Sequence, residues 1–308
     1  MERMTRAASL LVRRGLRTRG LHTTALVYRN HGEPEDALNF ERIPLGDGEV
    51  KIRVVASTVN PADVNTVQGK YPLKPPSLPA VGGSEGVGIV VDPGTSSVLK
   101  EGSVVIPARA NLGLWTRELA AQEADLHHLK AMDGRSVEEI KSAAMIPVIY
   151  GTAHRLLQEF CGHLETGDSI IQNGATSAVG QAVVQLAKLR GLKTINLIRD
   201  SEEREEREEW LRAMGADIVA TPEHLKARAQ GFQPKVAFNC VGGEHSAAIA
   251  KRLCRGGTIV TYGGMSREPV ILPTPLMIFK DIQAKVRRLS LSLSLSLSLA
   301  DSLGFSLF

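Results

Sequence analysis

The residues best suited to binding chemistry form a turn of small side chains between a short apolar run and an apolar helical face. The stretch 169–188 reads SIIQNGATSAVGQAVVQLAK, which predicts a strand, a tight turn and a helix. Backbone N–H groups at the start of such a helix lack intrahelical acceptors and lie at the positive end of its dipole, so they can hold a phosphate. The strict G-x-G-x-x-G fingerprint is absent, because only Gly174 and Gly180 stand near its glycine positions. An ordinary strand–helix turn remains open on this stretch alone.

Arg199 follows the next predicted strand, at the position that separates NAD sites from NADP sites. The strand ends in NLIRD at 196–200. An NAD site usually carries an acid there for the ribose hydroxyls, whereas an arginine can pair with the 2′-phosphate of NADP. Arg199 therefore favours NADP, and the adjacent Asp200 makes the preference less sharp.

Two later strands also end in glycine-containing turns, FNCVGG at 238–243 and TYGGM at 261–265. Such turns lie at the carboxyl edge of a parallel sheet, where this class of fold places its cofactor. Glycines after strands are common in any fold, but their recurrence after three strands favours a binding site.

The elements that position these turns alternate between strand and helix. We expect strands at 169–173, 193–198, 217–220, 235–239 and 257–262, and helices at 136–146, 152–160, 178–190, 202–214 and 245–254. The alternation predicts a parallel sheet with helices on both faces.

Residues 23–135 have a different character. Short β-branched runs at 49–57, 88–91 and 103–106 are separated by turns, and 58–88 is expected to be a long stretch rich in loops and dense in Pro and Gly. This pattern predicts a compact, barrel-like β domain. The predicted fold class is α/β: a β-rich domain followed by a Rossmann-type domain with a doubly wound parallel sheet.

The most charged predicted helix, at 202–214, is assigned no chemistry. Two i,i+4 ion pairs are expected on a solvated face and three apolar side chains against the sheet: Glu203–Arg207, Glu208–Arg212, and Trp210, Leu211 and Met214.

The N-terminus accounts for the basic balance of the 308-residue chain. Residues 1–20, MERMTRAASLLVRRGLRTRG, contain six arginines and one acid, so they carry +5 in a chain of +4 and leave −1 elsewhere. An arginine-rich, acid-poor segment is typical of a mitochondrial transit peptide, with a basic surface tail as the alternative. The high pI is therefore no reason to expect a nucleic-acid partner. No apolar run reaches the ~20 residues of a membrane span.

The three cysteines, Cys161, Cys240 and Cys254, are odd in number and lack C-x-x-C spacing. We expect free thiols, and neither a disulfide framework nor a structural zinc site.

The end of the chain, 289–308, reads LSLSLSLSLSLADSLGFSLF. Read as structure, this alternation gives a strand with one apolar face. A repeated CT dinucleotide, read CTC-TCT, also encodes Leu-Ser-Leu-Ser. Our hypothesis is that 286–308 is an aberrant low-complexity tail translated from a microsatellite in an intron or untranslated region. A supported coding exon with mixed codons would contradict it.

The most selective pattern lies at 59–88, VNPADVNTVQGKYPLKPPSLPAVGGSEGVG. With the turns above, its N-P-x-D-x-N, Q-G-x-Y-P and L-P-A-V-G-G-x-E-G runs make roughly 22–285 resemble the mitochondrial trans-2-enoyl-thioester reductases. These are zinc-free medium-chain dehydrogenases/reductases of mitochondrial fatty-acid synthesis. The resemblance implies a GroES-like catalytic domain at 21–147 and a Rossmann NADPH-binding domain at 148–285.

The resemblance also implies an activity: reduction of trans-2-enoyl thioesters, carried by acyl carrier protein or coenzyme A, with NADPH. The family's catalytic tyrosine matches Tyr71, although a tyrosine before proline is by itself more often a packing residue. Its hydroxyl would support the thioester enolate as hydride reaches the β-carbon and a proton the α-carbon. The family's cofactor positions match Thr176, Ser177, Ala178, Val179, Arg199, Asp200, Ser201, Tyr262, Gly263, Gly264 and Met265.

No metal is expected, because zinc-containing relatives have a cysteine ligand near 60–65 and this chain has no Cys or His there. The resemblance further implies a homodimer and, with residues 1–20, the mitochondrial matrix.

Three departures from the family leave other functions open. Residues 149–152 read IYGT where the family has Asn-Pro, so one cofactor contact is expected to be lost or remade. After IFKD at 278–281 the family has an aromatic run that helps to line the site, and this chain has VRRLS at 286–290 instead. The family also continues beyond the last residue of this chain. An NADPH:quinone reductase of the same superfamily and an inactive truncated isoform are the alternatives.

Overall fold

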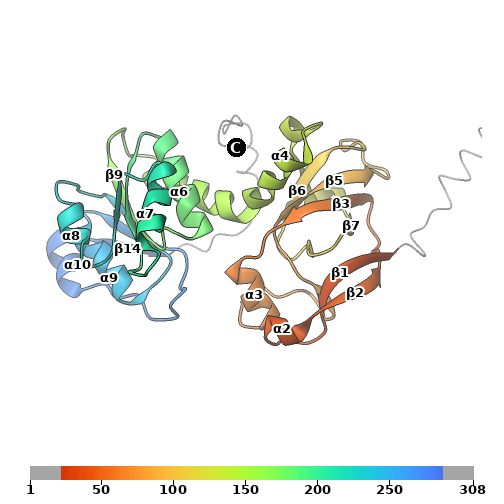
Figure 1. Cartoon of the computed structure of the whole chain (residues 1–308), viewed down its shortest axis with the longest axis horizontal. Coiled ribbons are helices and arrows are strands. Elements are labelled where there is room, and N and C mark those ends of the chain that lie inside the picture. The colour runs from red at the N-terminus through yellow and green to blue at the C-terminus, as the bar shows by residue number, and fades with distance from the viewer. Residues whose placement is uncertain (1–21, 287–308) are drawn as a thin grey trace, which may run out of the picture. The chain divides into compact units, whose positions relative to one another are not determined.

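The computed structural model describes residues 22–286, which divide after Val148 into two compact units (Figure 1). The predicted transit peptide at 1–20 and, apart from Val286, the predicted tail at 286–308 lie outside the described residues. Each unit has its own sheets and core, so each is considered by itself.

The first unit is built from short antiparallel strands. One sheet has the order β2-β1-β4 and the other the order β7-β3-β5-β6-β8. The strands form where β-branched residues alternate, as in β3, which buries Val50 and Ile52 on one face. The strands are β1 (His22–Tyr28), β2 (Leu38–Pro44), β3 (Val50–Ser57), β4 (Ala80–Val81), β5 (Gly86–Asp92), β6 (Val104–Pro107), β7 (Glu118–Ala121) and β8 (Leu126–His128).

Helices in this unit are short and lie between the strands. They are α2 (Pro34–Ala37), α3 (Pro61–Val67), η1 (Glu123–Asp125), η2 (Lys130–Met132), α4 (Val137–Ser142), η3 (Ala143–Met145) and the π-helical turn η4 (Ile146–Tyr150) that leads into the second unit. The expected helix start at Ser136 is confirmed: the Glu139 carboxylate accepts the Ser136 N–H at 2.9 Å, and Ser136 Oγ accepts the Glu139 N–H at 3.4 Å.

The stretch 58–88, expected to be rich in loops, also contains the helix α3, which was not predicted. Asn60 precedes a proline at the first helical position, and Asp63 Oδ2 accepts the Asn60 N–H at 2.9 Å. These are recognised helix-start signals that the density of Pro and Gly obscured. β2 is also absent from the prediction, since its side chains are exposed or half-buried along its whole length.

The second unit contains one six-stranded sheet of order β11-β10-β9-β12-β13-β14, in which every neighbouring pair is parallel. When these six strands are numbered along the chain, this is the doubly wound order 3-2-1-4-5-6. The order in which the strands are added to the sheet reverses between β9 and β12. The strands are β9 (Ser169–Asn173), β10 (Lys193–Leu197), β11 (Ile218–Ala220), β12 (Val236–Asn239), β13 (Thr258–Thr261) and β14 (Gln283–Val286). The predicted α/β class is confirmed, with β14 added at the edge.

Helices cover both faces of this sheet (Figure 1). On one face, Ile249 and Ala250 of α9 join a cluster with strand residues such as Ile171 and Ile195. On the other, Val184 of α6 and Leu211 of α7 pack with residues of the sheet and its turns. The helices are α5 (Gly151–Cys161), α6 (Ala178–Leu189), α7 (Arg204–Ala213), α8 (Leu225–Arg228), α9 (Gly243–Arg252) and α10 (Thr274–Lys280).

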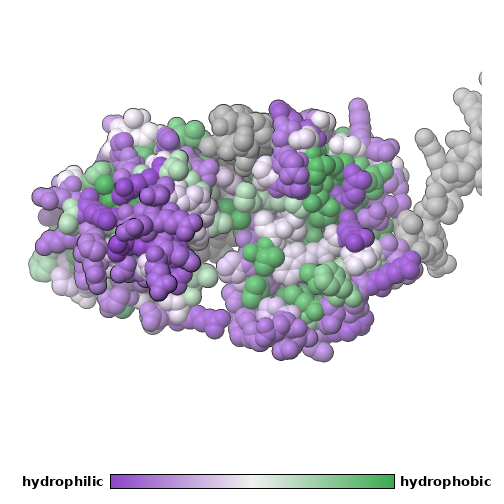
Figure 2. Space-filling view, in the orientation of Figure 1, coloured by the Kyte–Doolittle hydropathy of each residue, from purple (hydrophilic) through white to green (hydrophobic). Residues whose placement is uncertain are grey.

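Helix α7 departs from its prediction at two residues. The expected ion pairs Glu203–Arg207 and Glu208–Arg212 are present, and Figure 2 shows a hydrophilic surface over this helix. Glu208, however, is only 8% exposed, so it does not lie on a solvated face. Trp210 is 46% exposed, and the contacts with the core cluster come from Leu211 and Met214. No helix among residues 22–286 is long and apolar enough to cross a membrane.

Candidate functional site

Gly174, in the turn after β9, and Gly180, in the first turn of α6, lie where the strand order reverses, and each is required by close contacts. Gly174 has φ +63°, and a Cβ built on it would lie 2.5 Å from the Sγ of Cys240, which follows β12. A Cβ on Gly180 would lie 2.6 Å from the carbonyl oxygen of Gly174. The first glycine therefore permits the tight turn and the second lets α6 pack directly on it, although the formal fingerprint is missing.

Buried asparagines tie the carboxyl ends of the three central strands together. Asn173 Nδ2 donates to Asn239 Oδ1 at 2.6 Å, and Asn239 Nδ2 donates to Thr261 Oγ1 at 3.0 Å. The Cys240 N–H donates to Asn173 Oδ1 at 2.8 Å. Both asparagines are fully buried. Neither asparagine was among the predicted site residues, and the available signal was an asparagine at the end of β9 and again at the end of β12.

The first turn of α6 presents backbone donors. Ser177 caps the helix, its Oγ accepting an N–H of the first turn at 3.2 Å. The N–H groups of Ala178 and Val179 belong to that turn, where a helix supplies no acceptor of its own. Thr176 is held by its carbonyl oxygen, which accepts Gln181 Nε2 at 2.8 Å. Since Ser177 and Ala178 are exposed, an anion can reach these donors.

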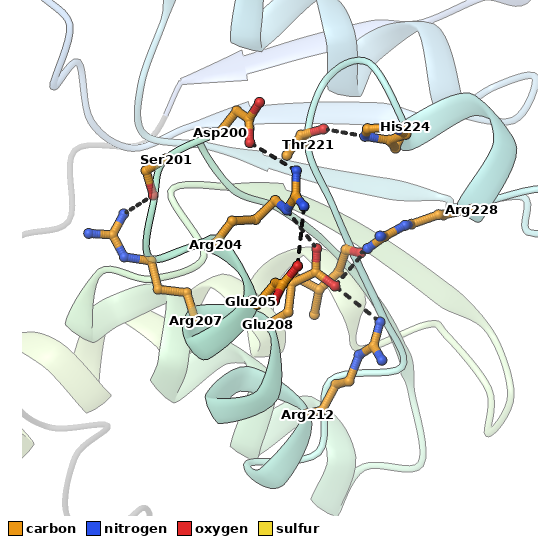
Figure 3. A network of polar contacts seen from close by, with 11 residues as sticks. Asp200, Ser201, Arg204, Glu205, Arg207, Glu208, Arg212, Thr221, His224 and Arg228 are labelled. Carbon is orange, nitrogen blue, oxygen red and sulfur yellow. Dashed lines mark hydrogen bonds and ion pairs between the residues drawn. The ribbon is translucent and has the colours of Figure 1, made fainter.

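The end of β10 brings arginines beside the predicted residues at 199–201. Arg199 is exposed and makes no hydrogen bond or ion pair with another described residue. Arg204 Nη1 donates to Asp200 Oδ1 at 3.2 Å, and Arg207 Nη1 donates to Ser201 Oγ at 3.3 Å (Figure 3). Guanidinium groups near this strand end suit a phosphate on the ribose better than a bare hydroxyl.

The turn after β13 is bound to the turn after β12 through the backbone. The Tyr262 N–H donates to Asn239 O at 3.0 Å, and the Met265 N–H donates to Cys240 O at 2.9 Å. Gly263 packs closely enough that a Cβ on it would lie 3.2 Å from the Cys240 Cβ. The predicted cofactor turns at 174–179 and 262–265 therefore meet around one residue, Cys240.

The side chains of the second turn differ in their access to ligand. The Tyr262 hydroxyl is buried against the Cys240 thiol, and burial raises the pKa of Tyr262 well above its ordinary value. Burial likewise raises the pKa of the Cys240 thiol. Met265 is 59% exposed, and a Cβ on Gly264 would meet no atom within 4 Å. Gly264 and Met265 can thus face a cofactor, whereas the Tyr262 hydroxyl is buried beside Cys240 at the carboxyl edge of the sheet.

Together, these groups fit a dinucleotide with a 2′-phosphate. Free donors at the start of α6 suit the pyrophosphate, and the turns lie at the reversal point where such folds bind nucleotides. The exposed Arg199 suits the additional phosphate.

In the first unit, Tyr71 is positioned by the turn that follows α3. Its N–H donates to the carbonyl oxygen of Asn65 at 3.0 Å, and its side chain is half-buried. The start of α3 is fixed by Asp63, which accepts the N–H groups of Asn60 at 2.9 Å and Ser84 at 3.1 Å. Burial raises the pKa of the Asp63 carboxyl, against the effect of these donors. The N-P-x-D-x-N motif therefore shapes the segment that carries Tyr71.

Glu85 is a buried acceptor that the sequence analysis did not single out. It accepts hydrogen bonds from Thr58 Oγ1 and Asn60 Nδ2, both at 2.8 Å, and from the Val148 N–H at 2.7 Å. Its side chain is fully buried, so these donors stabilise its charge. The signal available was the acid within the glycine-rich GGSEG segment.

Trp115 explains the glycine pair in the same segment. A Cβ on Gly82 would lie 2.2 Å from the Trp115 ring, and one on Gly83 would lie 2.5 Å from it. The indole Nε1 donates to the Thr58 carbonyl oxygen at 2.9 Å. The loop that holds Asn60 is thereby fixed from two sides.

Ile149, at the departure from the family pattern, is buried within η4. Over residues 22–286 no group of three or more His, Cys, Asp or Glu side chains is arranged to hold a metal ion.

Comparison with known proteins decides the family. The description "Alcohol dehydrogenase GroES-like domain" matches residues 46–134, and "Zinc-binding dehydrogenase" matches residues 178–293. The mitochondrial enoyl-[acyl-carrier-protein] reductase of Rattus norvegicus is 42% identical over 275 residues, covering 86% of this chain and 72% of the relative. The chain belongs to this reductase family.

Solved structures agree with this assignment. The Etr1p/NADP/crotonyl-CoA complex has a TM-score of 0.80 and 32% identity, covering 92% of this chain and 86% of that one. The mitochondrial 2-enoyl thioester reductase Etr1p/Etr2p heterodimer of Candida tropicalis has a TM-score of 0.79 at the same identity and coverage. The expected GroES-like and Rossmann-type combination is therefore confirmed as the fold of this reductase.

Proposed function

We propose that this chain reduces trans-2-enoyl thioesters to saturated acyl thioesters with NADPH, in mitochondrial fatty-acid synthesis. The observation that carries the proposal is Tyr71, held by the α3 turn in a chain 42% identical to an enoyl-[acyl-carrier-protein] reductase. The substrate is a thioester of acyl carrier protein or coenzyme A, in line with the crotonyl-CoA of the Etr1p complex.

The cofactor is bound by the second unit. The N–H groups of Ala178 and Val179 donate to the pyrophosphate, and Arg199 binds the 2′-phosphate. The other residues proposed to line the cofactor site are Thr176, Ser177, Asp200 and Ser201, together with the backbone of the turn 262–265 and the side chain of Met265. When bound, NADPH supplies the hydride that reduces the β-carbon of the substrate.

Tyr71 is the residue of the first unit that acts on the reacting atoms. Its hydroxyl donates a hydrogen bond to the thioester carbonyl oxygen, where negative charge develops as the enolate forms. It also supports delivery of the proton to the α-carbon. No metal takes part in this proposal, because the chain has no Cys or His near 60–65.

The proposed assembly is a homodimer in the mitochondrial matrix. The names of this chain's relatives describe them as mitochondrial, and residues 1–20 have the composition of a transit peptide. Exposed apolar side chains lie on α10 and β14, where Phe279 is 72% exposed and Val286 is 83% exposed. We expect light scattering of the purified protein to give twice the chain mass, and a monomer at micromolar concentration would contradict the dimer.

Steady-state kinetics separate this function from that of a quinone reductase. NADPH oxidation is measured with a crotonyl thioester and, in parallel, with a benzoquinone. We expect turnover of the thioester, and turnover of the quinone alone would overturn the proposal.

A further inference from the structure

A carboxylate at the end of β10 opposes the proposed 2′-phosphate site. Asp200 directly follows Arg199, at the strand end where an acid favours the ribose hydroxyls of NAD. A phosphate monoester carries a charge of about −1.5 to −2 at pH 7, so a free carboxylate beside it would repel it. Something must therefore offset Asp200 for NADPH to bind tightly.

Arg204, in the first turn of α7, contacts this carboxylate. Its Nη1 donates to Asp200 Oδ1 at 3.2 Å, four residues apart along the chain (Figure 3). The Arg204 side chain is 32% exposed, so it is confined more than a typical surface arginine. The pairing neutralises the one acid of the predicted strand-end residues 199–201.

Glu208 holds Arg204 in this position. The Glu208 side chain is 11% exposed, and its Oε1 faces Arg204 Nε at 4.0 Å. Both of these atoms are buried and have no hydrogen-bond partner among the described residues. The two atoms therefore form an ion pair without a hydrogen bond, and each is the oppositely charged atom that faces the other at this separation.

Two further arginines fix the other oxygen of Glu208. Arg228 Nη1 donates to Glu208 Oε2 at 2.7 Å, and Arg212 Nη2 donates to it at 3.3 Å. Arg228 Nη1 also donates to the Val219 carbonyl oxygen at 2.8 Å, which anchors the group to β11. Glu208 is therefore a fixed point against which Arg204 is oriented toward Asp200.

We infer that Arg204 is a specificity-determining residue for NADPH: it neutralises Asp200, with Glu208 as its positioning residue, so that the 2′-phosphate meets the unopposed charge of Arg199. The inference rests on the proposed use of NADPH. It assigns a role in cofactor choice to a helix whose sequence alone suggested none.

A double-mutant cycle tests this role. Dissociation constants for NADPH and NADH are measured by fluorescence titration for the wild type, Arg204→Ala, Asp200→Asn and the double variant. We expect Arg204→Ala to weaken NADPH by about tenfold and NADH by less than about threefold. The double variant should regain most of the NADPH affinity, because no carboxylate is left to neutralise.

Two control variants separate charge from folding. Arg204→Lys keeps the charge and should retain most of the NADPH affinity. Arg109→Ala removes an arginine of the first unit that pairs with Asp125 and has no contact with this network, and it should leave both affinities within about twofold.

Each contrary result has a distinct meaning. Equal weakening of NADPH and NADH by Arg204→Ala would show a merely structural role and overturn the inference. A double variant as weak as Arg204→Ala would show direct contact with the phosphate, which also overturns it. A wild type that does not bind NADPH would overturn both this inference and the proposed function.

Discussion

At the scale of single residues, Tyr71 is the proposed donor to the developing enolate oxygen. Replacing it by phenylalanine removes the hydroxyl and leaves the half-buried aromatic ring in the turn that follows α3. We expect Tyr71→Phe to lower kcat with a crotonyl thioester by about 10²–10³, the usual effect of losing one oxyanion donor. The NADPH dissociation constant and the melting temperature serve as controls. Loss of NADPH binding would show that Tyr71 is structural.

Arg199 is the second residue with a direct prediction. Because it has no other described partner, its loss should be felt by the 2′-phosphate alone. We expect Arg199→Ala to weaken NADPH by about 10–100-fold, as for a charge-assisted hydrogen bond, while NADH binding stays nearly unchanged. Equal weakening of both nucleotides in a titration would refute the role.

Individual residues differ in how far the sequence alone could reveal them. Tyr71 and Arg199 stand in short local patterns, so they could be singled out. Glu85 could not, because its partners at 58, 60 and 148 come together only in the folded chain. Arg204 could not be singled out either: Glu208 was interpreted as part of a solvated face, because its burial depends on contacts with Arg228, twenty residues further on.

At the scale of elements, the junction between β9 and α6 depends on Gly174. We expect Gly174→Ala to lower the free energy of unfolding by roughly 2–4 kcal/mol, the sum of left-handed strain and contact with Cys240 Sγ. Denaturant unfolding measures the change.

A matched variant separates the two contributions. Gly256 also has a positive φ, +74°, but a Cβ on it would meet nothing within 4 Å. Gly256→Ala should therefore show the strain alone, about 1–2 kcal/mol. In a Cys240→Ala background the cost of Gly174→Ala should fall toward that value. An unchanged cost would mean that Cys240 does not restrict the turn.

The elements of the second unit were the more predictable ones. Strand and helix alternate there with clear apolar runs, and the parallel sheet follows from that alternation. In the first unit α3 was missed, because its start signals lie in a segment dense in Pro and Gly. β14 was missed for a different reason: all four of its residues are exposed, so it has no buried face to give a pattern.

At the scale of the whole molecule, the free energy of unfolding is expected to depend on pH through the buried thiols of the second unit. Burial raises the pKa of Cys161 from 9.0 to about 12. The folded state therefore keeps a proton that the unfolded state loses. The contribution is complete below about pH 9 and is lost as pH rises from there toward about 12, with a slope of at most ~1.4 kcal/mol per pH unit.

Two cysteine variants test this pH dependence. We expect Cys161→Ala to make the alkaline fall in the free energy of unfolding shallower, because one buried thiol with a raised pKa is gone while the buried Cys240 thiol remains. Cys254→Ala, which removes a half-exposed thiol, should leave that fall in place. Parallel curves for the wild type and Cys161→Ala, from denaturant titrations between pH 8 and 11, would contradict the assignment.

The activity itself is tested most directly by following the transferred hydrogen. The purified chain is incubated with crotonyl-CoA and NADPH in two separate reactions, in which the NADPH carries deuterium on one face or on the other face of nicotinamide C4. The product of each reaction is analysed by mass spectrometry and NMR. The proposed function predicts a butyryl thioester with deuterium at the β-carbon from one of the two cofactors and a solvent hydrogen at the α-carbon. Recovery of unreduced crotonyl thioester, or a product without deuterium at the β-carbon from either cofactor, would contradict it.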